Sequence, residues 1–257
     1  MWPKLSVLLA LAGCLFAPGL VRATPIVFGV QFTTNGEAGT VDVATGSFTI
    51  VGSVGPHQIN DVAYSPGGAI YAIADEDELV TINPATGALT AVMPVPGFET
   101  LVFRPSNGTL FAATTGALFT INLANQTYTE IGNYGSAIGN NAQNIRFDQA
   151  GNLYTTDTGT PTDVFLISTS TGQATFDFSV PFGALSLGFA GDKLYGVGIP
   201  LIGGSGNLVW IDPLTKTGTE TLASFPGVDF SQAPEPAAVG LCGLGLAALA
   251  VCRRRRP

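Results

Sequence analysis

Residues 61–93 read DVAYSPGGAIYAIADEDELVTINPATGALTAVM and contain four short segments in which apolar residues alternate with small or polar ones. The segments are 61–66, 69–73, 79–83 and 88–93, and Gly, Pro, Asn and Asp stand between them. Alternation with a period of two is typical of a strand with one buried face, and the intervening residues are those that turns require. This stretch therefore predicts four short strands joined by turns.

The same pattern recurs about every 41 residues along the chain. Aromatic residues that end the first strand of each unit are 39, 44, 42 and 41 residues apart: Tyr64, Phe103, Phe147, Phe189 and Phe230. A second aromatic series follows the Gly-rich turn: Phe28, Tyr71, Phe111, Tyr154 and Tyr195. Four-stranded units at a period of 40 to 45 residues are typical of β-propeller blades, and we expect the second series to pack between blades.

The number of blades follows from the two ends of the repeat. The first segment of the body, 26–30, has the pattern of the second strand of a unit, and its last segment, 228–230, has the pattern of the first strand of a unit. The sequence therefore predicts a single all-β, five-bladed propeller within residues 24–232, in which the last strand completes the blade that the N-terminal strands begin. This pairing would close the ring and leave no open edge between blades. Gly87, Gly172 and Gly218 are predicted to supply positive φ in the turns.

Composition and charge exclude several classes of protein. Apolar residues make up 46% of the 257 residues and charged residues 11%, which excludes a disordered chain. The 33 Gly and 17 Pro residues argue against a helical one. Between residues 24 and 233 stand 4 basic and 17 acidic residues, so phosphate backbones would be repelled and nucleic acid is an unsuitable partner. Cys14, Cys242 and Cys252 lie in the terminal segments, so we expect no disulfide in the body.

The N-terminal segment 1–23 has the pattern of a secretory signal peptide. Lys4 precedes the apolar run 5–20, and Val21-Arg22-Ala23 places small residues where a signal peptidase reads them, so cleavage is predicted before Thr24. An alternative is a lipoprotein signal, because Leu11-Ala12-Gly13-Cys14 resembles a lipobox in which Cys14 would carry the lipid.

The C-terminal segment 233–257 has three consecutive parts. The sorting motif Pro234-Glu235-Pro236 precedes an uncharged apolar run at 237–252, and an arginine cluster follows: Arg253, Arg254, Arg255 and Arg256. As a helix, 16 residues extend about 24 Å, which spans a bilayer when long side chains reach the interface. The arginines are expected to stop the transmembrane helix on its cytoplasmic side.

This tail resembles the PEP-CTERM sorting signal of Gram-negative bacteria, whose C-terminal part has also been called an ice-binding protein C-terminal domain. The resemblance implies processing by exosortase, transient residence in the inner membrane, and delivery to the cell surface or the extracellular matrix. It also implies exopolysaccharide or surface proteins as partners. The body is similar, in its repeat texture alone, to YVTN/quinoprotein-like propellers, and that similarity carries no catalytic residue.

Polar residues are expected to gather where the chain enters the first strand of each blade and leaves the second. The predicted ligand or cation rim at this loop face consists of Asp61, Glu99, Asn144, Asp75 and Asp77. Oxygen ligands of this kind suit Ca²⁺ or the hydroxyls of a neutral sugar. His57 is the only histidine, so a His-ligated metal centre is not expected within one chain, and we predict no resident cofactor.

Two functions remain open from the sequence. The first is a non-enzymatic binding or structural module that is exported and sorted by exosortase. The second is a carbohydrate-active hydrolase in which Asp61 and Glu99 would be the paired carboxyl groups. They differ in whether the rim carboxylates bind a ligand or transfer protons.

Overall fold

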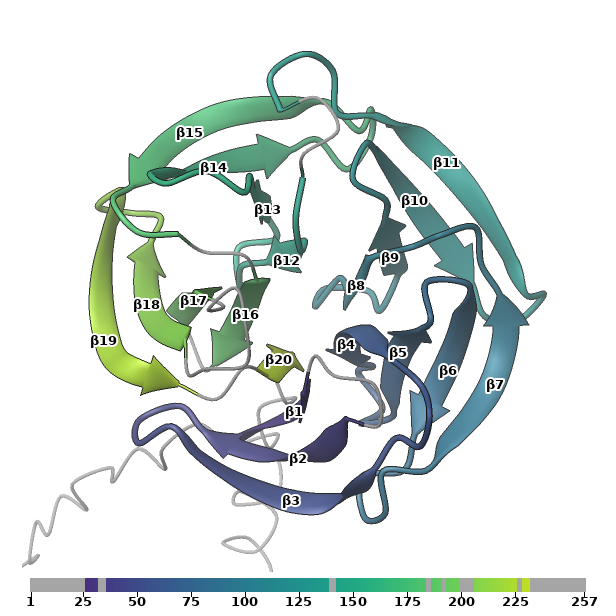
Figure 1. Cartoon of the computed structure of the whole chain (residues 1–257). Helices are drawn as coiled ribbons and strands as arrows, with labels where there is room; N and C mark the ends of the chain where they lie inside the picture. Colours follow the sequence, from purple (N-terminus) through teal and green to yellow (C-terminus); the bar gives the residue numbers. More distant parts are fainter. Residues whose placement is uncertain are drawn as a thin grey trace, which may run out of the picture.

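The computed structural model describes residues 26–31, 36–138, 142–183, 186–190, 193–198, 206–225 and 228–231. Within these ranges all regular structure is β, and the strands form five four-stranded sheets around a common centre (Figure 1). The predicted five-bladed all-β propeller is therefore confirmed. No helix of the described residues is long and apolar enough to cross a membrane. The predicted signal peptide, sorting motif and transmembrane segment lie outside the described residues.

Each blade is a sheet whose first strand lies nearest the centre and whose fourth strand lies at the rim (Figure 1). Blade 1 contains β4 (Ile59–Tyr64), β5 (Ile70–Ala74), β6 (Glu78–Ile82) and β7 (Leu89–Pro94). Blade 2 contains β8 (Thr100–Phe103), β9 (Leu110–Ala113), β10 (Ala117–Asn122) and β11 (Thr127–Asn133). Blade 3 contains β12 (Arg146–Phe147), β13 (Leu153–Thr156), β14 (Thr162–Ile167) and β15 (Ala174–Val180). Blade 4 contains β16 (Ser186–Ala190), β17 (Lys193–Gly198), β18 (Gly206–Asp212) and β19 (Thr217–Phe225). Blade 5 contains β20 (Val228–Ser231), β1 (Ile26–Gln31), β2 (Glu37–Asp42) and β3 (Ser47–Ser53).

The two ends of the repeat meet in blade 5. Strand β20 pairs antiparallel with β1, from Phe28 opposite Ser231 to Gln31 opposite Val228. This is the predicted closure of the ring. It pairs β20 with a strand from the other end of the repeat, and it gives β1 a second neighbour beside β2.

Turns between the third and fourth strands share one hydrogen-bonding pattern in blades 1, 2, 4 and 5, whereas blade 3 has Ser168 in place of the Asp or Asn. An Asp or Asn side chain accepts the N–H two residues on, at 2.9 Å from Ala44 to Asp42 and 2.9 Å from Ala85 to Asn83. The fourth residue after this Asp or Asn has positive φ: 71° at Gly46 and 75° at Gly87. The prediction for Gly218 is wrong, because this position in blade 4 falls on Lys216 with φ 57°.

The hydrophobic core lies between neighbouring blades. Five clusters of buried residues each draw on two adjacent sheets, for example one in which Phe111 of β9 packs edge-on against Phe147 of β12 with ring centroids 5.4 Å apart. Arg104 lies over both rings. The second aromatic series thus packs between blades, as the repeat predicted, and each blade is stabilised by both of its neighbours.

Candidate functional site

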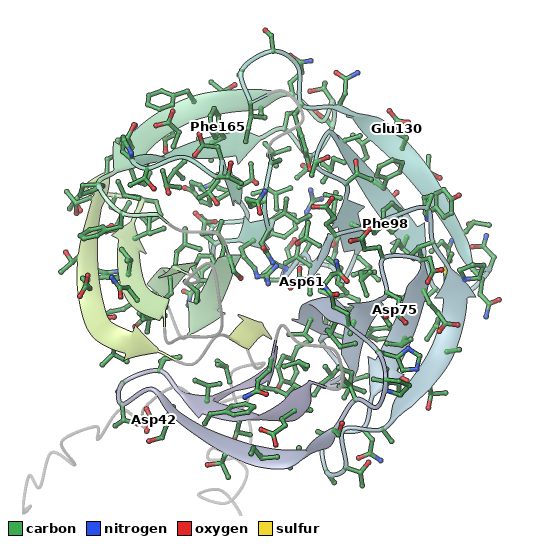
Figure 2. The ribbon with its side chains drawn as sticks, in the orientation of Figure 1. Asp42, Asp61, Asp75, Phe98, Glu130 and Phe165 are labelled. Atoms are coloured by element: carbon green, nitrogen blue, oxygen red, sulfur yellow. The ribbon has the colours of Figure 1, made fainter. Side chains whose placement is uncertain are left out.

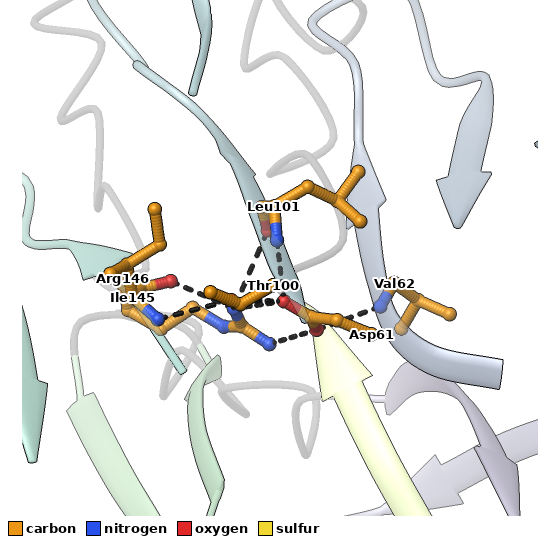
Figure 3. A network of polar contacts seen from close by, with 6 residues as sticks. All are labelled: Asp61, Val62, Thr100, Leu101, Ile145 and Arg146. Carbon is orange, nitrogen blue, oxygen red and sulfur yellow. Dashed lines mark hydrogen bonds and ion pairs between the residues drawn. The ribbon is translucent and has the colours of Figure 1, made fainter. Parts of the chain in front are cut away.

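A buried ion pair lies where the innermost strands of three blades approach one another. Asp61 on β4 is fully buried, and Arg146 on β12 is 2% exposed. Arg146 Nη2 lies 2.6 Å from Asp61 Oδ1, and Nη1 lies 2.9 Å from Oδ2, so the guanidinium grips the carboxylate with two nitrogens (Figure 3). Such bidentate pairs are the strongest geometry available to arginine and a carboxylate.

The same carboxylate also holds the strand of blade 2. Asp61 Oδ2 accepts hydrogen bonds from the Thr100 hydroxyl and from the Leu101 N–H, the latter at 2.8 Å (Figure 3). Thr100 Oγ1 in turn accepts the Ile145 N–H at 3.1 Å, and Arg146 donates to the Ile145 carbonyl at 2.8 Å. The network therefore joins β4, β8 and the entry to β12, and both carboxylate oxygens of Asp61 are occupied.

Asp61, which the sequence placed on the rim, therefore lies in a buried network, and its partner Arg146 is a residue that the sequence analysis did not single out. Asp61 is not an open rim carboxylate, because strand β4 turns it toward Thr100 and Arg146. Arg146 carried a usable signal: the residue before the aromatic of the first strand is Ala63 in blade 1, Val102 in blade 2 and Gly188 in blade 4, and Asp229 in blade 5 is the other charged residue at this position. A charge at a position that most blades fill with a small or apolar residue indicates a buried partner.

The acidic loop between β5 and β6 lies away from this centre. Asp75 is exposed, and its Oδ2 lies 2.7 Å from His57 Nδ1 while its Oδ1 accepts the Gln58 N–H at 2.9 Å. The Gln58 N–H and then His57 hold the pKa of Asp75 below its usual value. Figure 2 shows Asp61 near the ring centre and Asp75 farther out. Asp77 is exposed on the same loop, so neither aspartate converges with Asp61.

Glu99 is the predicted rim residue with the most unusual surroundings. It precedes β8 and is half-buried, and its N–H donates to the Ala113 carbonyl at the end of β9. Burial and then the nearby charge of Glu76 raise the pKa of Glu99. Tyr134 is fully buried, and burial raises its pKa. The charge of Glu99 lies close enough to raise the pKa of Tyr134 further. The Tyr134 hydroxyl has no hydrogen-bond partner among the described residues.

The described residues contain no group of three or more His, Cys, Asp or Glu that could hold a metal ion. Asn144, which is half-buried before β12, completes the set of predicted rim residues. The structure thus divides that set: Asp61 belongs to the buried network, whereas Glu99, Asp75 and Asp77 remain within reach of solvent. A surface of this kind can accept hydrogen bonds from a ligand or attract a cation.

Breaking the buried ion pair should destabilise the ring strongly. We expect Arg146→Met to lower the free energy of unfolding by about 3 to 5 kcal/mol, because the Asp61 carboxylate would stay buried without its countercharge. The double variant Asp61→Asn/Arg146→Met should lose less than the sum of the two single losses. Urea denaturation of all variants measures both quantities.

The control for that series is Lys216→Met, which removes the exposed ion pair between Lys216 and Asp177. Its loss should not exceed about 1 kcal/mol. A loss of similar size in Arg146→Met would contradict the structural role of the buried pair.

Glu99→Gln should stabilise the protein at neutral pH. The pKa of Glu99 is higher in the folded protein than in the unfolded chain, so ionising Glu99 lowers the free energy of unfolding. The loss is complete at pH values above the folded-state pKa, and it is absent at pH values below the unfolded-state pKa. We expect a gain of no more than about 1 kcal/mol at pH 7, since the group is partly solvated, and no gain below about pH 4. Thermal unfolding at both pH values measures this difference, with Glu130→Gln on the exposed face of β11 as control. A lower melting temperature for Glu99→Gln at pH 7 would refute the assignment.

Comparison with solved structures supports the propeller fold. A structural genomics protein of unknown function from Bacteroides thetaiotaomicron is 12% identical with a TM-score of 0.53; the match covers 67% of this chain and 53% of that one. A chain of the nidogen/laminin complex is 12% identical with a TM-score of 0.53, covering 82% and 81%. TolB from Acinetobacter baumannii is also 12% identical with a TM-score of 0.53, covering 82% and 67%. This chain spans about half the length of the Bacteroides protein, and identities this low support the fold alone.

Comparison with curated proteins gives no match. Residues 232–256, however, match the family model of the PEP-CTERM protein-sorting motif, as the sequence predicted from Pro234-Glu235-Pro236 and the arginine cluster. The chain therefore carries a PEP-CTERM sorting motif behind a β-propeller body, and this motif implies an exported protein that is processed by exosortase and anchored transiently in the membrane before its release at the surface.

Proposed function

We propose that the mature protein is a non-enzymatic binding or structural module of the cell surface or extracellular matrix, and that it holds its partner at the loop face of the propeller. The sorting motif at 232–256 supports export and surface delivery. The ring closed by β20 and β1 supports a rigid body that presents loops from five blades on one face.

The non-enzymatic part of this proposal rests on Asp61, whose two carboxylate oxygens both accept hydrogen bonds within the protein. A glycoside hydrolase needs two carboxyl groups that flank a substrate, one to donate a proton and one to attack or to activate water. Asp61 is fully buried and accepts hydrogen bonds from Arg146, Thr100 and Leu101. Its ion pair also favours the charged form, so it suits neither the proton donor nor a nucleophile open to substrate. The hydrolase alternative is therefore disfavoured.

The remaining rim residues favour binding. Glu99 is half-buried beside the buried Tyr134 hydroxyl, and Asp75 and Asp77 extend the acceptor surface on the neighbouring loop. Carboxylates accept hydrogen bonds from sugar hydroxyls and protein N–H groups, and they attract cations such as Ca²⁺. With 4 basic and 17 acidic residues between 24 and 233, the body would repel anionic polymers, so neutral exopolysaccharide or a surface protein is the favoured partner.

The test is to express the full chain in an exosortase-bearing host and in the same host without exosortase. We expect the protein in the surface or released fraction to lack Arg253–Arg256 in the first host and to stay membrane-bound in the second. Mass spectrometry of both termini measures this. The purified mature protein should release no product from a panel of polysaccharides.

Two results would overturn the proposal. Released protein that keeps its arginine cluster would refute sorting by the tail. Product formation that Glu99→Gln or Asp61→Asn abolishes would establish the hydrolase instead, since loss of turnover without loss of binding identifies groups that act in the transition state.

A further inference from the structure

A polar groove lies on blade 2 at the end of the strands opposite the loop face. Its volume is about 430 Å³, and it is lined by residues 107–110, 120–123 and Thr129. These residues come from the turn between β8 and β9, the end of β10 and the start of β11. Glu99 lies at the other end, because its N–H pairs with the carbonyl of Ala113, the last residue of β9. The groove is thus separate from the surface proposed above for partner binding.

The chemistry of the groove is polar and uncharged. Hydroxyl groups come from Thr109, Thr120 and Thr129, and amide groups from Asn107 and Asn122. Asn107 Oδ1 accepts the Thr109 N–H at 3.1 Å, and Asn122 Oδ1 accepts the Ala124 N–H at 3.0 Å. These bonds fix the two side chains in place and leave their Nδ2 groups as donors.

The apolar residues at the border of the groove belong mainly to the core, since Leu110 is 2% exposed and Ile121 is 5% exposed, and only Leu123 is half-buried. The volume lies between 300 and 1,000 Å³, which is the range of sites for small ligands.

The residues of blade 2 leave open a place that long side chains fill in blade 4. Thr120 pairs with Phe111 across the sheet as Trp210 pairs with Tyr195, so Thr120 and Trp210 occupy the same position in their blades. Thr109 likewise corresponds to Lys193. In blade 4 the Lys193 ammonium lies 4.2 Å from the centre of the Trp210 ring, so that long side chains cover the place where blade 2 has two threonines.

We propose that this groove is a binding site for a neutral saccharide unit. The threonine hydroxyls can both donate to and accept from sugar hydroxyls, and the asparagine amides add donors at fixed positions. The half-buried Leu123 adds apolar surface that can pack against the C–H face of a sugar ring. None of the lining residues carries a charge, and the acidic body repels uronic acids and phosphates, so the ligand is uncharged.

The test uses a printed array of neutral hexose and N-acetylhexosamine oligosaccharides with the mature protein, followed by titration calorimetry of the strongest hit. Thr120→Trp should weaken binding about tenfold or more, because it fills the groove in the way that Trp210 fills blade 4. Thr81→Trp is the matched control, since Thr81 pairs with Tyr71 at the equivalent position of blade 1. It should leave the affinity within twofold. Thr109→Val removes one groove hydroxyl at nearly constant volume, and a severalfold loss is expected.

Three outcomes would overturn the inference. The first is the absence of binding to any neutral oligosaccharide at millimolar concentrations. The second is unchanged binding in both Thr120→Trp and Thr109→Val, and the third is an equal loss in Thr120→Trp and Thr81→Trp. Binding that Glu99→Gln weakens while the groove variants do not would place the sugar at the loop face, which would refute this site and leave the proposed function standing.

Discussion

The ion pair between Arg146 and Asp61 is the interaction on which the centre of the ring depends. The innermost strand of a propeller blade has one edge without a neighbouring strand, so its N–H groups need partners from elsewhere. Asp61 satisfies the Leu101 N–H of β8, and Thr100 satisfies the Ile145 N–H that leads into β12. Arg146 compensates the charge that makes this arrangement possible. Asp61 and Thr100 thus supply acceptors for two N–H groups that face no neighbouring strand, and Arg146 balances the charge of Asp61.

Because the centre is held in this way, the two ends of the strands are free to differ from blade to blade. At the loop face the chain carries the acidic residues Asp75, Asp77 and Glu99, of which Glu99 is held in a partly buried position that raises its pKa. At the opposite end, equivalent positions carry Thr120 in blade 2 and Trp210 in blade 4 without any change in strand pairing. Such positions cost the fold little and change what each face can bind, which is how repeat architectures acquire function.

The sequence was sufficient to predict the architecture, because a period of 41 residues with alternating apolar positions leaves few other folds open. It also predicted the closure through β20 and β1, since the repeat begins and ends at complementary strands. It did not predict the ion pair, because Arg146 and Asp61 are 85 residues apart and a repeat shows which residues share a register but not how far a side chain reaches across the centre. For that reason the sequence assigned Asp61 to an open rim, whereas the structure places it in the buried network. The environment of Glu99 was hidden in the same way, since it depends on burial beside Tyr134.

Amide hydrogen exchange at Leu101 and Ile145 tests this account most directly, because their N–H groups bond to Asp61 and Thr100 in the centre of the ring. If the network holds the ring together, both amides should exchange only through global unfolding, at the slowest rates in the protein, and Arg146→Lys should accelerate both. Exchange at these two positions as fast as at the amides of the outermost strand β11, or rates that Arg146→Lys does not change, would contradict the claim that the Arg146–Asp61 pair holds the three blades together.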